Sequence, residues 1–426
     1  MIDKIIALLG EKGLYGWELS QTVTRGWEFY FIRHELDQNR IKDVEHITLC
    51  VYQPSGEGFI GSASAEIAPT ATLEEVRRLI DDLSYRASLV QNKLYALNAP
   101  KAGQPVREEA DLAEISRNFI SAVRGLPETE GEDVNSYEVF ASQVTRRLIT
   151  STGIDVTETA PVSMLEAVVN ARRDGHEIEV YRNIRCGTCD AASVSETLKK
   201  AMTYGHDRLS AQKTPALGAV DVLFSGQDAC SLYEFFTMRM NAAMICRRMS
   251  DWSVGKSIYD GGSGDWVTVK ALKCLPNSSH NAGFDAEGAP IEDTFMIEAG
   301  VPKRVLGGRM FSSYLGLEDS FIPGNIEVSG GTASEGDLRA GQYLEAVEFS
   351  DFQVDPMTGD IFGELRLGYL HDGKGGVKIV TGGSISGSMF DLYPDMRFSA
   401  AQAQYNDMRI PALTRLYGVT LTGAAE

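Results

Sequence analysis

The chain has 426 residues, enough for two or three domains, and 43 % of them are hydrophobic, as expected for a protein with a buried core. Its 40 Lys and Arg residues against 59 Asp and Glu residues give a net charge of −19. Such an acidic chain repels phosphate backbones, so nucleic-acid binding is not expected. The six cysteines are sparse and irregularly spaced, which argues against a disulfide framework and indicates a reducing compartment.

The N-terminus begins with a short apolar run over residues 2–10 that is interrupted by Asp3 and Lys4. A signal peptide needs a longer uncharged core, and no stretch of the chain approaches the ~18 apolar residues of a membrane span. We therefore predict an amphipathic first helix and a cytoplasmic protein without a membrane partner.

The first half of the chain is expected to alternate helices with strands. Thr72 and Glu75 form a capping box, which opens a helix with one apolar face. This face predicts packing against a sheet, and its residues are Leu73, Val76, Ile80, Leu83, Ala87, Val90 and Leu94. Asn98–Pro105 is typical of a linker. The other predicted elements are a strand at Ile47–Val51, a helix at Asp111–Val123, strands at Tyr137–Ile149 and Glu177–Ile184, a helix from a capping box at Ser193 and Glu196 to about Tyr204, a strand at Val220–Phe224, and a long helix from about Asp228 to Arg248.

Beyond Gly255, glycine becomes frequent and short β-type runs recur between turn signals. These runs lie at residues 266–272, 294–297, 345–354, 362–370 and 377–379. The whole pattern predicts an α+β fold, with an N-terminal α/β domain followed by a large, mostly antiparallel β-rich domain. We place the boundaries at 1–105 for the first domain, 106–215 for a middle region of helices and strands, and 216–426 for the β-rich domain.

A contiguous zinc-hydrolase motif is absent from the sequence. Such a motif pairs two histidines on one helix face with a catalytic carboxylate. The six histidines are His34, His46, His176, His206, His280 and His371, and no two of them lie within one helical turn. A zinc site assembled from distant residues stays open at this point.

Three other segments have a chemical and a structural interpretation. The segment Cys186-Gly187-Thr188-Cys189 could be a redox pair or half of a zinc ribbon. A zinc ribbon needs a second Cys pair, which the sequence does not have. The segment is equally compatible with a turn whose two thiols have no chemical role. Gly382–Ser388 is glycine-rich but lacks the Lys-Ser/Thr of a phosphate-binding loop, which favours a β-turn. The methionines of the long helix could line a peptide surface, but core positions are favoured; they are Met238, Met240, Met244 and Met249.

A series of short segments in the second half carries a resemblance. They are Asp285-Ala286-Glu287-Gly288, Ile297-Glu298-Ala299-Gly300, Pro323-Gly324-Asn325-Ile326, Ser334–Leu338, Thr358-Gly359-Asp360, Gly382–Ser388, Pro411-Ala412-Leu413 and Val419–Gly423. In their order and spacing, these segments resemble the TldD/PmbA family, also described as proposed modulators of DNA gyrase. From about Val220 onward the resemblance is continuous, whereas the first 210 residues match more loosely.

The resemblance implies an N-terminal α/β domain, a β-rich C-terminal domain, and dimers that enclose a cavity. In the TldD branch, a helix with His-Glu-x-x-x-His and a later cysteine hold zinc, and the pair of subunits cleaves unfolded or flexible peptides. The PmbA branch, which is TldE-like, lacks these ligands but is needed as the partner.

This chain departs from the TldD pattern in the helix Leu232–Arg239. We align Asp251–Lys256 with the small-residue segment that follows this helix in the family. In this alignment the family's two histidines fall near Glu234 and Arg239, and its general base falls near Phe235. No cysteine follows Cys274, and an arginine is hostile to a bound cation. We therefore expect no catalytic, metal or cofactor-binding residues in this chain, and whether it is itself an enzyme stays open.

Three functions are compatible with the sequence. The first is a PmbA/TldE-like non-zinc subunit that pairs with itself or with a TldD-like zinc peptidase subunit and acts on peptides. The second is a homodimeric peptide-binding or scaffold protein without catalytic activity. The third is an enzyme that uses Cys186 and Cys189, and it requires an exposed thiol with a low pKa.

Overall fold

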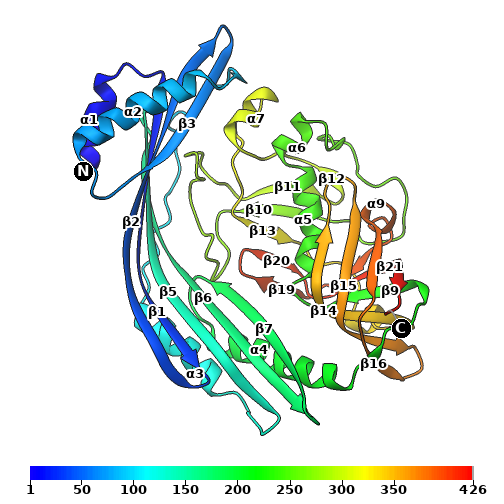
Figure 1. Cartoon of the computed structure of the whole chain (residues 1–426). Helices are drawn as coiled ribbons and strands as arrows, with labels where there is room; N and C mark the ends of the chain where they lie inside the picture. Colours follow the sequence, from blue (N-terminus) through cyan, green and yellow to red (C-terminus); the bar gives the residue numbers. More distant parts are fainter. Residues whose placement is uncertain (425–426) are drawn as a thin grey trace.

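The structure, a computed structural model, describes residues 1–424 and confirms the predicted α+β class. A long curved sheet from the first half of the chain bends around a compact β-rich C-terminal part (Figure 1). None of the helices within the described residues is long and apolar enough to span a membrane.

The N-terminal sheet has seven antiparallel strands in the order β4-β3-β2-β1-β5-β6-β7. These are β1 (Gly16–Ile32), β2 (Glu35–Gly56), β3 (Phe59–Ile67), β4 (Asn92–Lys93), β5 (Glu132–Thr150), β6 (Asp155–Arg173) and β7 (His176–Cys186). Strands from the two expected regions, 1–105 and 106–215, thus share one sheet. Within β5, buried and half-buried residues alternate from Ser136 to Ala141, because successive side chains point to opposite faces.

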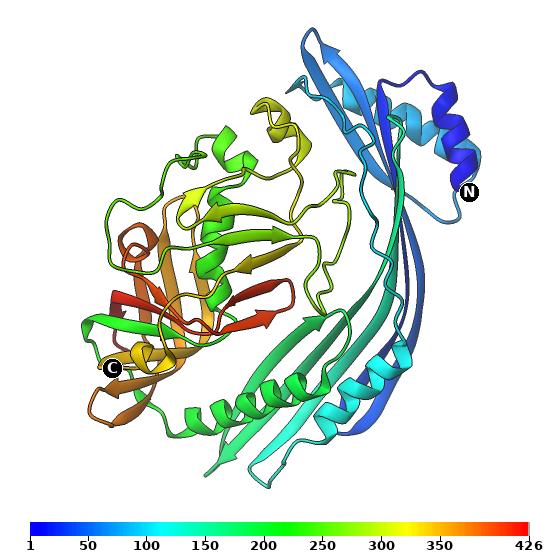
Figure 2. The same ribbon diagram turned by 180° about the vertical axis from the view of Figure 1, so that it is seen from behind.

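Four helices cover one face of this sheet: α1 (Ile2–Glu11), α2 (Leu73–Ser88), α3 (Leu112–Arg124) and α4 (Ala191–Ser210). The first two pack on β2 and β3 around Leu49 and Ile80, and the other two pack on β5 to β7 around Phe119 and Leu165. Figure 2 shows α3 and α4 side by side on the lower part of the sheet. The capping box of Thr72 and Glu75 is present.

The C-terminal part contains two sheets. A six-stranded sheet has the order β12-β11-β10-β13-β20-β19. Its strands are β10 (Val269–Leu272), β11 (Thr294–Glu298), β12 (Val301–Pro302), β13 (Asn325–Val328), β19 (Gln402–Tyr405) and β20 (Met408–Pro411). The second sheet comprises β8 (Gln212–Lys213), β9 (Gly218–Phe224), β14 (Gln342–Val354), β15 (Asp360–Asp372), β16 (Val377–Thr381), β17 (Ser384–Ser388), β18 (Arg397–Phe398) and β21 (Thr414–Thr422).

In this second sheet, β14 pairs with both β9 and β15, so the strands β14-β9-β21-β17-β15 close into a ring. Helix α5 (Ala229–Arg239) lies between the two sheets (Figure 1), and its side chains share a core with both. Shorter helices are α6 (Ala242–Cys246), α7 (Arg309–Tyr314), α8 (Glu335–Leu338) and α9 (Met389–Leu392).

Several predicted boundaries were wrong. The expected long helix breaks after α5, because the Asn241 side chain accepts a hydrogen bond from the Ala243 N–H and starts the new helix α6. Asp190, rather than Ser193, caps α4, which continues to Ser210. Helix α2 ends at Ser88, so the last two residues of the predicted apolar face, Val90 and Leu94, are exposed. The strands β1 and β6 had not been predicted.

An ion pair joins the N-terminal sheet to the C-terminal part. Arg309, the first residue of α7, donates hydrogen bonds to Glu18 on β1 and to the Tyr52 hydroxyl on β2. Tyr52 in turn donates to Glu18 over 3.0 Å. The side chains of Arg309 and Glu18 are only 8 % and 12 % exposed. Removing one partner would leave the other charge without its counterion in a nearly dry site.

A second junction lies at the other end of the sheet. Arg182 on β7 pairs with Glu348 on β14, and both side chains are mostly buried. Asp228, which directly precedes α5, faces this pair, and burial together with Glu348 raises the pKa of Asp228 to about 6. Tyr369 on β15 donates a 2.6 Å hydrogen bond to Asp207 on α4.

The first junction predicts a large effect of Arg309→Met. Because the buried Glu18 carboxylate would lose its partner, we expect the free energy of unfolding to fall by about 3–5 kcal/mol. Urea unfolding followed by circular dichroism measures this change. Arg78→Met, which breaks an exposed pair with Glu74, is the matched control and should change stability by less than about 1 kcal/mol. Equal effects of the two substitutions would contradict the assignment.

The second junction predicts a pH-dependent effect of Asp228→Asn. The folded state raises the pKa of this carboxyl from 3.8 to about 6, so its ionisation costs stability as the pH rises through this interval. At pH 7 the substitution should therefore stabilise the protein by about 1–3 kcal/mol, and near pH 4 it should have little effect. Urea unfolding at both pH values tests this, with the exposed Asp260→Asn as control. Stabilisation that is the same at both pH values would refute the ionisation argument.

Candidate functional site

Helix α5 carries the segment where the resemblance places zinc chemistry. Four of its residues, Leu232, Tyr233, Phe235 and Phe236, are almost fully buried. A helix that is apolar on nearly all sides fits a position between two sheets. The Tyr233 hydroxyl shares a 2.8 Å hydrogen bond with Thr414 on β21, which satisfies this polar group in the core.

Arg239, the last residue of α5, is a buried cation. Its guanidinium lies over three aromatic rings, at 5.8 Å from Phe235, 5.0 Å from Trp252 and 4.7 Å from Phe390. It donates hydrogen bonds to the Pro356 carbonyl over 3.1 Å and to the Asp251 carboxylate over 2.5 Å. The Arg239 side chain is 4 % exposed, so ring faces and these acceptors take the place of water.

The residues at the three positions singled out in α5 do not fit a zinc ion. Phe235 offers no donor atom, and Arg239 brings a permanent positive charge that is already enclosed by aromatic rings. Only Glu234 has an oxygen donor, and desolvation together with the neighbouring Asp407 raises the pKa of Glu234. Within residues 1–424, no group of three or more His, Cys, Asp and Glu side chains is arranged to hold a metal ion.

The histidines do not assemble into a site of their own. Five of them each lie close to one carboxylate, and these five pairs are in different parts of the fold. The pairs are His34 and Glu128, His46 and Glu66, His206 and Glu132, His280 and Asp407, and His371 and Glu345. The pair nearest α5 is His280 with Asp407, whose Nδ1 and Oδ2 atoms are 3.1 Å apart. Each contact is local to one pair, and none of these pairs shares a carboxylate with another.

The two cysteines of the Cys-x-x-Cys segment are structural. Cys186 ends β7 and Cys189 precedes α4, and both are free thiols in the core between the sheet and this helix. Burial raises the pKa of each thiol to about 12, so both are protonated at neutral pH. A thiol in this state is a poor nucleophile, and the thiol-enzyme hypothesis loses its basis. The glycine pair Gly382-Gly383 forms the turn between β16 and β17, with φ of 76° at both residues, as the β-turn interpretation expected.

The Asp-x-Glu-Gly segment positions helix α7. Asp285 accepts hydrogen bonds from the N–H groups of Glu287, Ala289 and Ile322, which fixes the turn. Glu287 accepts a 2.6 Å hydrogen bond from the N–H of Arg309 at the start of α7. This segment therefore holds the arginine that joins the two halves of the molecule.

The methionines divide between core and surface. Met240 and Met244 are buried, in agreement with the core interpretation, whereas Met238 and Met249 are 41 % and 39 % exposed.

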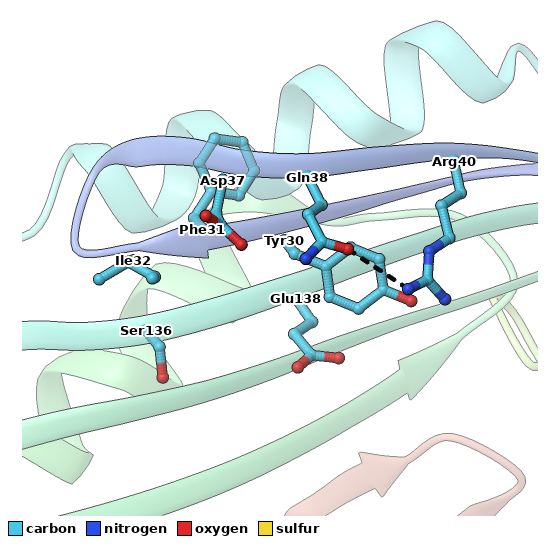
Figure 3. A pocket seen from close by; sticks show the side chains of 8 residues that line it. All are labelled: Tyr30, Phe31, Ile32, Asp37, Gln38, Arg40, Ser136 and Glu138. Atoms are coloured by element: carbon cyan, nitrogen blue, oxygen red, sulfur yellow. Dashed lines mark hydrogen bonds between the residues drawn. The ribbon is translucent and has the colours of Figure 1, made fainter.

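Sequence reasoning missed a cavity on the N-terminal sheet. The cavity has a volume of about 310 Å³ and is lined by Tyr30, Phe31, Ile32, Asp37, Gln38, Arg40, Ser136 and Glu138 (Figure 3). Phe31 and Val139 pack on the helical side, so their neighbours Tyr30 and Glu138 point away from the helices. We call this uncovered side the open face and define it by Glu28, Tyr30, Gln38, Arg40, Glu138, Phe140, Glu166 and Asn183. In the sequence, this open face is indicated by the alternation of polar and apolar residues in β5.

Comparison with protein families matches residues 217–423 to the PmbA/TldA metallopeptidase C-terminal domain. Comparison with curated proteins finds no match. The fold is similar to TldE from Thermococcus kodakarensis, with a TM-score of 0.79 and 15 % identity over 99 % of this chain and 100 % of that one. It is also similar to two proposed modulators of DNA gyrase. The protein from Thermotoga maritima has a TM-score of 0.77 and 18 % sequence identity. The protein from Bacteroides thetaiotaomicron has a TM-score of 0.81 and 14 % sequence identity.

These two comparisons cover 99 % of this chain, with 99 % of the Thermotoga and 98 % of the Bacteroides protein. At such low identity the structural likeness concerns the fold, while the family match covers the part of the chain that contains α5, the two C-terminal sheets and the Asp285–Gly288 turn. Together they confirm the resemblance drawn from the sequence motifs: residues 217–423 belong to the TldD/PmbA family, and the chain as a whole has the fold of the three similar structures.

Proposed function

We propose that this chain is a PmbA/TldE-like non-zinc subunit of a cytoplasmic TldD/PmbA-type peptidase that acts on unfolded or flexible peptides. The observation that carries the proposal is the aromatic enclosure of Arg239. It puts a permanent cation at one of the positions where the resemblance expects a zinc ligand. A TldD-like partner would supply the metal and the catalytic residues, and this chain would shape the space through which the peptide passes.

The edge of the N-terminal sheet supports pairing with another subunit. Strand β2 pairs with β1 from Glu35 to Tyr52, but β3 covers its other side only from Ile47 onward. Within residues 1–424, no strand pairs with the outer side of Glu35–His46. Such an edge presents unpaired backbone groups that a strand from another chain can meet. Ile41, in the middle of this edge, is 80 % exposed.

The first test measures zinc and peptide hydrolysis with and without a TldD-like chain from the same organism. The purified chain alone should hold no stoichiometric zinc and should leave an unfolded peptide intact, because Phe235 and Arg239 cannot serve as ligands. The mixture should hold zinc and cleave the peptide, and a chelator should stop the cleavage. Metal analysis and chromatography of the peptide products give the two readouts.

Cleavage by this chain alone that survives a chelator would refute the subunit proposal, as would stoichiometric zinc at α5. If the organism encodes no relative with His-Glu-x-x-x-His, the subunit proposal gives way to the alternative, a homodimeric peptide-binding or scaffold protein.

The second test concerns the β2 edge. Ile41→Asp places a charge in the middle of the proposed contact and should weaken the association of subunits by about tenfold or more. Light scattering after size exclusion, over a range of concentrations, measures this. Leu89→Asp is the matched control, since Leu89 is 65 % exposed at the end of α2 on the helical side. Unchanged association of Ile41→Asp would place the contact elsewhere.

A further inference from the structure

We propose that the end of helix α5 binds a carboxylate of a peptide, which pairs with the Arg239 guanidinium in place of the Asp251 side chain. The ligand is therefore an anion at a position where the resemblance expects a ligand of a metal cation. The inference rests on the proposed function for the peptide as the molecule that is bound, and it adds the chemical group that is recognised. Binding itself requires only this chain.

The argument begins with the edge of the guanidinium that carries Nε and Nη2. These two atoms donate in parallel, which matches the two oxygens of one carboxylate. Arg147 and Asp155 show the complete arrangement in this protein, with the Nε and Nη2 atoms of Arg147 at 2.9 Å and 2.8 Å from the two carboxylate oxygens. At Arg239, only Nη2 is used in this way, by one oxygen of Asp251.

The second donor on this edge of Arg239 is left over. Within the described chain, its Nε atom is buried and has no hydrogen-bond partner, and the whole residue is only 3 % exposed. Because Nε and Nη2 share one edge, Nε points to the same side as the bond to Asp251. A buried donor without an acceptor costs free energy. A carboxylate that accepts from both atoms is therefore favoured over the present one-point contact.

The present counterion is loosely held. The Asp251 side chain is 88 % exposed, and within the described chain its carboxylate accepts no hydrogen bond other than the one from Arg239. Asp251 lies in residues 247–268, which connect α6 to β10 without any helix or strand. Connections of this length inside a compact domain are uncommon and often functional. A side-chain rotation is enough to free the guanidinium edge, while the neighbouring Trp252 stays in the core.

This mobility separates Arg239 from two other arginines. The Nε atoms of Arg409 and Arg415 are also buried without a partner. Their carboxylates, however, belong to Glu327 on β13 and Asp221 on β9, and these side chains are only 15 % and 28 % exposed. A residue within a strand is fixed by its backbone pairing, so these two counterions cannot be exchanged for a ligand.

The surroundings of Arg239 suit a peptide. The faces of Trp252 and Phe390 and the Pro356 carbonyl hold the guanidinium in place independently of Asp251. Phe390 and Met357 are exposed, so an apolar side chain next to the carboxylate finds a surface to pack on. The protein as a whole carries a net charge of −19 and repels anions. A preference for a carboxylate must therefore come from a local cation.

The experiment compares three fluorescently labelled Gly/Ser peptides that end in leucine. The first has a free C-terminal carboxylate, the second is amidated and neutral there, and the third is amidated but carries one internal glutamate. Fluorescence anisotropy with the whole Asp251→Ala chain measures the three Kd values. We expect at least one carboxylate peptide to bind about tenfold more tightly than the neutral one, and the tighter of the two identifies the source of the carboxylate. That peptide should bind the unsubstituted chain about tenfold more weakly, because the tethered Asp251 competes for the same edge.

The matched control is Asp260→Ala, which removes the same charge from an exposed position of the same connection. It should leave all three Kd values close to those of the unsubstituted chain. Equal tightening in Asp251→Ala and Asp260→Ala would show only weaker repulsion by an acidic protein and would overturn the proposal. Equal binding of the three peptides to Asp251→Ala would also overturn it.

A second variant removes the cation itself. Arg239→Gln in the Asp251→Ala chain should abolish the preference for the carboxylate, and a preference that survives would overturn the proposal. Circular dichroism checks that this variant is folded; if it is not, the comparison of Asp251→Ala with Asp260→Ala decides alone. Zinc content and peptide hydrolysis do not enter these measurements, so failure here and failure of the subunit proposal are distinguishable.

Discussion

The buried charge of Arg239 is the constraint around which the C-terminal part is organised. A guanidinium that is almost shielded from water needs other groups to replace its hydration. Here the faces of Trp252 and Phe390, the Pro356 carbonyl and the Asp251 carboxylate do so, and they come from three segments outside α5. Helix α5, the loop after α6, the β14–β15 turn and α9 are therefore tied together by one side chain. The same group that fixes this packing makes the site unsuitable for a metal cation.

The two halves of the molecule depend on each other in a similar way. The Asp285 turn and Glu287 position Arg309, and Arg309 reaches across to Glu18 and Tyr52 in the N-terminal sheet. A sequence motif that marks the family thus acts through geometry: it holds one half of the protein against the other. The C-terminal part contacts the sheet at Arg309 and Arg182, and also at Glu158 on β6, whose carboxylate accepts hydrogen bonds from the N–H groups of Gly283 and Phe284.

Much of the fold could be predicted from local patterns. The capping box at Thr72, the apolar stripe of α2 and the β-runs after Gly255 rest on short-range rules and were found. The strands β1 and β6 were missed because tertiary pairing, rather than composition, makes residues such as Gln21 and Glu158 extended. The break at Asn241 depends on one side-chain cap. The cavity beside Glu138 could not be found at all, since it needs the register of the three strands β1, β2 and β5, and register is a property of the folded sheet.

The ring of strands in the C-terminal part has a consequence for biosynthesis. Strand β9 is made early, but its two neighbours are β14 and β21, and β21 reaches only to Thr422. While a ribosome is still translating, β9 and the apolar helix α5 that follows it lack the partners that will cover them. Contacts this distant along the chain close late and slowly. The nascent protein must therefore shield a hydrophobic helix for about two hundred codons, which makes it a natural client for chaperones that bind emerging chains.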